Sequence, residues 1–191
     1  MANVNCPTLR HIKQEDQCEE NFAGLGAIGY IFVKGDLNAP LDDGAGKKIT
    51  KVYSFPEKSA KPFKEGKGFF RIDLLPGSQS ITGESQSKNG GFKQTAQLII
   101  KVVNEEVAEL CRALNNLDWA LILPDGDKWQ VMYLHNTQKI TLDAGAIKTE
   151  TGAQASDSRQ TTVAPVLENC YFPNTWLQFA EGEGPEDFLA E

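Results

Sequence analysis

The sequence predicts a mainly β fold, a β-barrel or β-sandwich, with one flanking helix. Short β-prone runs recur along the chain, and segments rich in Gly, Pro, Asn and Asp separate them. Only the stretch near residues 104–116 repeats apolar residues at helical spacing. No repeat of about 20–50 residues, which would indicate a solenoid or a propeller, is present.

Length, composition and charge narrow the class of protein. The 191 residues correspond to about one domain, and the hydrophobic and charged fractions are those of an ordinary globular protein. The net charge of -7 argues against a surface that binds nucleic acid by neutralising phosphates. Residues 1–13 have no signal-peptide pattern, and no apolar run approaches the roughly 18 residues of a membrane span. We therefore expect folding in a cytoplasm and no contact with a membrane.

Three parts are expected along the chain. Residues 1–26 have weak periodicity and are expected to form an N-terminal arm. Residues 27–179 are expected to form a single β-barrel or sandwich domain. Residues 180–191 form an acidic C-terminal tail that is expected to be disordered, with Phe188 and Leu189 as side chains able to dock.

The first half of the domain contains three predicted strands. Residues 27–33 are an apolar run bounded by glycines, which is typical of a buried strand, and residues 49–55 alternate as a half-buried strand does. A third run, residues 69–75, stops at Pro76 and Gly77. Gly, Pro and polar residues predict loops over 35–46, 56–66 and 83–91.

A long strand and the helix follow. Residues 92–103 are long enough for the central strand of a sheet. Asn104 is expected to cap the helix, because its side chain can accept from a free backbone N–H, and two glutamates follow in the first turn. The apolar positions at helical spacing, which predict one buried stripe, are Val107, Leu110, Cys111 and Leu114.

A hairpin is the clearest local signal in the second half. Residues 119–123 and 128–134 are apolar runs joined by Pro124-Asp125-Gly126-Asp127, in which Gly can take the positive φ that the turn needs. Later segments are predicted as a strand pair over 138–142 and 146–149, a polar loop over 151–160, a last strand over 161–167 and a buried aromatic segment over 171–179.

No arrangement of residues predicts catalysis, a cofactor or a metal ion. The two histidines, His11 and His135, lie in the arm and at a strand end, and no G-x-S-x-G motif is present. The G-x-G-x-x-G of residues 24–29 precedes a strand, the wrong context for dinucleotide binding. The aspartates of the Gly-rich loop lack EF-hand spacing. The cysteines have no metal-site spacing, and Cys111 and Cys170 are expected to be core thiols.

Other functions stay open at this point. Trp119, Trp129 and Trp176 indicate a ligand- or carbohydrate-binding β-sandwich module if they share one exposed face. An enzyme of unknown class would need His135 or Cys18 beside an acid or base in a cleft.

Three elements carry a resemblance to a known family. They are the long strand of residues 92–103 with its helix NEEVAELCRALNN, the hairpin WALILPDGDKWQVMYL, and the segment TETGAQASDSRQTTV followed by aromatic residues. This order is similar to that of phage tail-tube proteins, especially the variety found in prophages of gut Bacteroidetes. The N-terminal Cys6-Pro7-Thr8-Leu9 is a less specific similarity.

The resemblance implies a structural virion protein, not an enzyme, with a β-barrel or sandwich of tail-tube type. Type VI secretion tubes are expected to have a similar fold. Copies are expected to form a ring, in this family a hexamer, and the rings to stack into a tube through which DNA passes without specific binding. Sheath or tail-tip proteins are further expected partners. The expected location is the virion tail, and the host bacterial cytoplasm during assembly. Another virion protein, such as a tail terminator or a head–tail connector, is an alternative.

Within this interpretation, three loops are expected to form the assembly interface. Their residues are Asn89, Gly90, Gly91, Asp125, Gly126, Asp127, Thr151, Gly152, Ser156, Asp157, Arg159 and Thr161.

Overall fold

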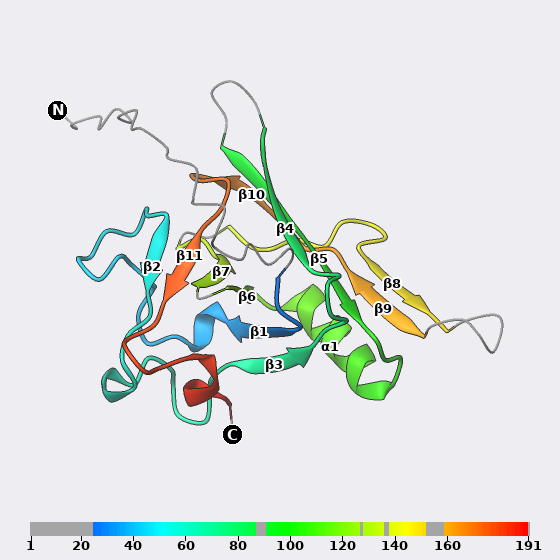
Figure 1. The fold of residues 1–191 in the computed structure, drawn as a ribbon, viewed down its shortest axis with the longest axis horizontal. Helices are drawn as coiled ribbons and strands as arrows, with labels where there is room; N and C mark the ends of the chain where they lie inside the picture. The colour runs from blue at the N-terminus through cyan, green and yellow to red at the C-terminus, as the bar shows by residue number, and fades with distance from the viewer. Residues whose placement is uncertain (1–24, 87–90, 127, 136–137, 152–158, 191) are drawn as a thin grey trace, which may run out of the picture.

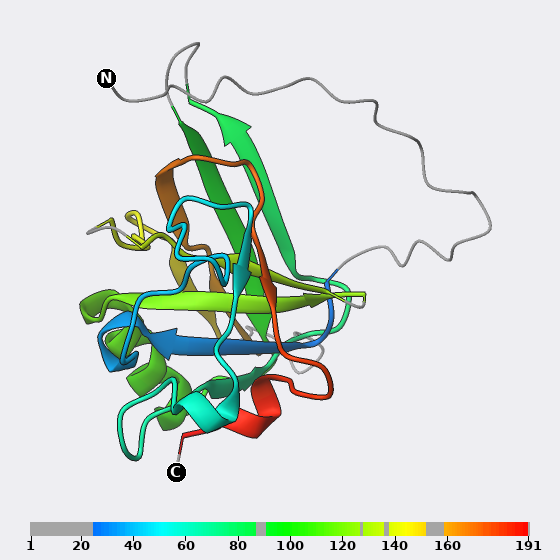
Figure 2. The ribbon, with the colours of Figure 1, turned by 90° about the vertical axis from the view of Figure 1, so that its left-hand side faces the viewer.

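The computed structural model describes residues 25–86, 91–126, 128–135, 138–151 and 159–190. These residues form eleven strands in two sheets, one α-helix and three short 3-10 helices (Figures 1 and 2). The predicted mainly β fold with one helix is therefore confirmed. The described strands form two open sheets and no closed barrel, which corresponds to the sandwich of the prediction.

The six-stranded sheet is built around the predicted hairpin. Its strands, in spatial order, are β2 (Val52–Ser54), β11 (Trp176–Gln178), β7 (Lys128–Met132), β6 (Trp119–Asp125), β1 (Ile28–Val33) and β3 (Phe70–Asp73). Asp125 pairs with Lys128 across the turn, and Gly126 has a φ of 58°. The hairpin and the role of its glycine are thus confirmed.

The five-stranded sheet is built around β5 (Phe92–Ile100). Its other strands are β4 (Ser80–Ser85), β8 (Ile147–Glu150), β9 (Gln160–Val163) and β10 (Val166–Cys170). β4 pairs with one side of β5, and β9 and β10 pair with the other side in one register as far as Leu167, after which the register shifts before Cys170. The single strand predicted over residues 161–167 is therefore divided in two at Pro165, which has no N–H to donate.

Two further predictions need correction. Residues 83–85 were expected in a loop but complete β4, a polar edge strand that pairs only with β5 among the described strands. Residues 138–142 were expected to form a strand, but the described part contributes only the bridge between Thr141 and Val166. β4 was missed because its residues are mostly polar and lack the apolar alternation of a half-buried strand. Residues 138–142 depend on a partner, Val166, that is distant in sequence.

One hydrophobic core lies between the two sheets and the helix. Trp119, Leu121 and Leu123 of β6 point into this core, whereas Ala120 and Ile122 point to the opposite face of the same sheet. Both faces of β6 are therefore buried, which explains why its sequence is continuously apolar and does not alternate.

An aromatic core covers the other face of the six-stranded sheet. Edge-to-face and tilted contacts join rings from β1, the segment between β2 and β3, and the C-terminal segment. The phenylalanines of this cluster are Phe32, Phe55, Phe63, Phe69, Phe179 and Phe188. Connections between strands thus form a layer of the fold.

The C-terminal segment belongs to the domain. It forms the 3-10 helix η3 (Pro185–Phe188), and Phe188 is buried in the aromatic core, whereas Leu189 is 41% exposed. The Phe69 N–H donates to the Phe188 carbonyl over 2.8 Å. A Cβ on Gly68 would lie 2.2 Å from that carbonyl oxygen, so this close approach requires glycine. The prediction of a disordered tail is wrong for residues 181–190, while the docking of Phe188 is confirmed.

The helix α1 (Glu105–Asn116) lies where the sequence predicted it. The Asn104 side chain accepts from the Val107 N–H over 2.9 Å, so the predicted cap is confirmed. Leu114 is buried, and its carbonyl accepts from the Trp119 indole over 2.8 Å, which ties the helix end to β6. No helix of the described residues is long and apolar enough to cross a membrane.

Candidate functional site

The predicted interface residues occupy three separate places. Gly91 precedes β5, Asp125 and Gly126 lie at the turn of the β6–β7 hairpin, and Thr151 and Arg159 are exposed beyond the ends of β8 and β9. The remaining predicted residues apart from Thr161 lie outside the described residues: Asn89, Gly90, Asp127, Gly152, Ser156 and Asp157.

The structure does not bring these places together. β9 pairs with Leu98, Ile99 and Ile100 at the far end of β5 from Gly91. Gly91 and Arg159 therefore lie at opposite ends of the five-stranded sheet. The predicted loops therefore lie in three separate surface regions, one at each end of this sheet and one on the other sheet.

Thr161 is not a surface residue. Its exposed fraction is 0%, and its hydroxyl donates to the Val102 carbonyl over 3.3 Å. The prediction that this side chain contacts a neighbouring subunit is corrected, because the alternation of β9 turns it inward.

Two open edges, β4 and β8, lie on opposite sides of the five-stranded sheet, and the outer side of β10 has only a bridge from Thr141 to Val166 among the described residues. No described strand pairs with the outer side of β4 or of β8, and the two strands lie on opposite sides of β5. The Ala164 N–H donates to the Ala146 carbonyl in register with the β8–β9 ladder. Because hydrogen-bonded and non-hydrogen-bonded pairs alternate in an antiparallel ladder, the N–H of Thr149 points away from β9. Unpaired groups of this kind are a template for another strand.

The two edges differ in charge. The exposed Glu84 lies on β4, whereas β8 contains Lys148, whose ammonium lies 2.6 Å from the Glu150 carboxylate. This contact raises the pKa of Lys148 and lowers the pKa of Glu150. Both groups therefore stay charged at neutral pH.

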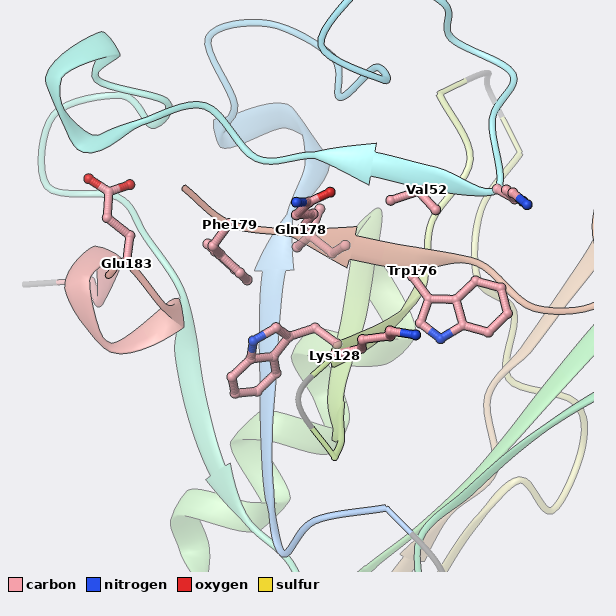
Figure 3. Close-up of a pocket in the computed structure, with 9 residues that line it drawn as sticks. Val52, Lys128, Trp176, Gln178, Phe179 and Glu183 are labelled. Atoms are coloured by element: carbon pink, nitrogen blue, oxygen red, sulfur yellow. The ribbon is translucent and has the colours of Figure 1, made fainter. Parts of the chain in front are cut away.

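A groove opens at the β2 end of the six-stranded sheet. Its volume is about 580 Å³, and strands β2, β11 and β7 with the segment after β11 form its walls (Figure 3). Its side chains combine aromatic rings with both signs of charge: Lys51, Val52, Lys128, Trp129, Trp176, Leu177, Gln178, Phe179 and Glu183.

Strand pairing assembles this groove. Trp176 pairs with Gln130 and Leu177 with Trp129, so the β11–β7 contact joins segments about 47 residues apart. The sequence drew attention to the tryptophans but gave no pairing for β11, and the other groove residues had no signal of their own. Trp119 does not belong to this site, because it is buried in the core between the sheets.

Two of the remaining candidate residues, Cys111 and Cys170, pack in or against the hydrophobic core. Cys170 is buried in the core, as predicted, and burial raises the pKa of its thiol to about 11. Cys111 is only partly buried and packs against this core, and its partial burial raises the pKa of its thiol. His135 is half-buried, whereas His11 and Cys18 lie outside the described residues. Within the described ranges, no three His, Cys, Asp or Glu side chains gather in a way that could hold a metal ion.

Comparisons of the chain with known protein families, with curated proteins and with solved structures find no match.

Proposed function

We propose that this protein is a structural subunit of a phage tail tube, which assembles into rings that stack and conduct DNA. One observation carries the proposal: the five-stranded sheet ends in two open edges, β4 and β8, on opposite sides of β5. A sheet with two open edges can continue from one copy into the next.

Pairing of β4 with the β8 of a neighbour uses two different surfaces of the same chain. In such a heterologous contact, each copy that pairs through one edge still has its other edge free for a further copy. The series of copies closes into a ring when the rotation from one copy to the next is a whole fraction of a full turn. Glu84 on β4 and Lys148 on β8 carry opposite charges, and Lys148 would have to contact Glu84 in addition to its partner Glu150. The order of sequence elements that resembles tail-tube proteins points to the same function, and a hexamer is the ring size that the resemblance implies.

The charge of the chain fits a conduit for DNA. With a net charge of -7, a ring lined by this protein would repel phosphates, so DNA could pass without being held. Sheath and tail-tip proteins are the partners that a tube of this kind would contact, and the virion tail is its proposed location.

The experiment measures molar mass by light scattering over a concentration series, with negative-stain images of the same samples. For the wild type we expect mass to rise from the 21.0 kDa of one chain to that of a ring, and rings or tubes to be visible. Thr149→Pro removes an outward N–H from β8 and should raise the concentration needed for assembly by about tenfold or more. Thr149→Val keeps the N–H and should assemble as the wild type does.

Circular dichroism of both variants controls for folding. A wild type that stays at 21.0 kDa at every concentration, or a folded Thr149→Pro variant that assembles as the wild type does, would contradict the proposal.

A further inference from the structure

We propose that the groove between β2, β11 and β7 binds an acidic carbohydrate, a short chain of sugars that carry carboxylates. This site is separate from the open edges of the five-stranded sheet, so the inference does not rest on ring assembly. Its volume of about 580 Å³ is in the range of small-ligand sites.

The aromatic walls of the groove are held by rigid strands. Trp176 lies in β11 and pairs with Gln130 of β7 on one side and Val52 of β2 on the other. The Trp129 ring meets Tyr30 and Phe179 edge to face, with centroid distances of 5.7 and 6.1 Å. By strand alternation Trp129 lies on the Leu177 face of these strands and Trp176 on the Gln130 face, and both line the groove. Each indole therefore offers apolar surface to a different part of a sugar chain.

Positive charge gathers at the Trp176 end. The backbone N–H of Trp176 donates to the Lys51 carbonyl over 2.9 Å, so the two residues are neighbours, and both line the groove. Figure 3 shows the Lys128 side chain extending toward Trp176. Neither ammonium has a carboxylate partner among the described residues, so both are available to a ligand anion.

Hydrogen-bond acceptors lie at the other end. The Oε1 atom of Glu183 accepts from the Lys58 N–H over 3.2 Å, whereas its Oε2 atom is buried and has no partner in the described part of the chain. Glu183 lines this end of the groove and supplies a carboxylate there. The exposed Gln178 amide can both donate and accept, which suits the hydroxyls of a sugar.

Because two lysines lie at one end of the groove and a glutamate at the other, the groove should bind some kinds of anion better than others. A sugar acid offers a carboxylate to the two lysines and hydroxyls to Glu183 and Gln178. A polyglutamate peptide or an oligonucleotide is charged along its whole length, so part of it would meet the Glu183 carboxylate. We therefore favour the acidic carbohydrate over both.

The test titrates the full-length chain with trigalacturonate and follows the indole N–H signals by two-dimensional NMR. The chain has three tryptophans, and we expect the signals of Trp129 and Trp176 to shift. The Trp119 signal should stay in place, because that indole is buried and bonded to the Leu114 carbonyl, and it reports that the fold is intact.

Three variants and a neutral probe complete the design. Trp176→Ala and Lys128→Met should each weaken trigalacturonate binding by about tenfold or more, roughly the effect of losing one contact of 1.4 kcal/mol. Tyr171→Ala removes an exposed aromatic residue outside the groove and should bind as the wild type does. The neutral trisaccharide galactotriose should bind more weakly.

The proposal is overturned if trigalacturonate leaves both indole signals unchanged, or if folded Trp176→Ala binds it as tightly as the wild type. Equal or tighter binding of triglutamate or of a trinucleotide would also overturn it, because the site would then recognise negative charge and not a sugar.

Discussion

Tyr30 joins the C-terminal segment to the centre of the six-stranded sheet. Its hydroxyl donates to the Glu186 carboxylate, which also lies 3.3 Å from the Arg71 guanidinium. Burial, and then the hydrogen bond to Glu186, raise the pKa of Tyr30 to about 12. The Glu186 carboxylate of η3 thus contacts both Tyr30 of β1 and Arg71 of β3.

This pKa predicts a pH dependence of stability. The folded chain holds the phenol proton more tightly than the unfolded chain, whose tyrosine pKa is about 10. The contribution of Tyr30 to the free energy of unfolding is therefore complete below about pH 10 and is lost as the pH rises toward about 12. Raising the pH over this range should therefore lower the free energy of unfolding less for Tyr30→Phe than for the wild type.

Urea unfolding of both proteins at about pH 8 and about pH 11 measures the effect. Burial also raises the pKa of Tyr53 and Tyr133, but both residues are present in both proteins and cancel in the comparison. A difference between wild type and Tyr30→Phe that does not shrink at the higher pH would refute the prediction.

At the scale of single elements, the helix depends on Asn104, the capping residue just before it. The Asn104 side chain satisfies the Val107 N–H, which has no partner within the helix. We expect Asn104→Ala to lower the free energy of unfolding by about 1 kcal/mol, and Asn104→Ser to change it by only a few tenths. Chemical denaturation compares the variants, and equal losses in both would show that capping is not the cause.

The C-terminal segment tests whether a short element stabilises the whole domain. Phe188 is buried among aromatic rings, so we expect Phe188→Ala to cost about 3 kcal/mol of unfolding free energy. Leu189 is the matched control, because it is 41% exposed and Leu189→Ala should cost less than about 1 kcal/mol. Similar small losses in both variants would mean that the segment does not stabilise the domain.

At the scale of the whole molecule, the two sheets differ in what they leave open. Both faces of the six-stranded sheet are covered, one by the other sheet and the helix and one by the aromatic core. The five-stranded sheet exposes its edges, and the β4–β5 hairpin extends beyond the body of the molecule (Figure 2). Both sheets contribute to the core between them, while the five-stranded sheet also offers the surface proposed for assembly.

Charge exchange at these edges tests the arrangement of copies. If β4 of one copy pairs with β8 of the next, Glu84→Lys and Lys148→Glu should each raise the concentration needed for half-assembly by roughly threefold to tenfold. The double variant should recover assembly, because the opposite charges are restored. Lys58→Glu, in the 3-10 helix η2 (Lys58–Ala60), is the control and should have little effect.

Light scattering at low salt measures these midpoints. If the double variant is no better than the single variants, the two edges do not meet.

Local chemistry accounts for the features that the sequence predicted correctly. The helix of residues 104–116 has its cap and its apolar spacing within one segment, and the β6–β7 hairpin has its turn residues between two adjacent strands. In both cases the groups that interact lie a few residues apart, so their order along the chain is enough.

The features that failed depend on contacts between distant segments. The C-terminal segment folds onto Phe69, and the groove, which the sequence did not predict, forms only when β11 lies against β7. The sequence by itself determined the mainly β class, the helix and the hairpin. Tertiary structure alone decided which faces are covered, which edges stay open and which residues line the groove, because burial of one strand depends on the partners that the rest of the chain supplies.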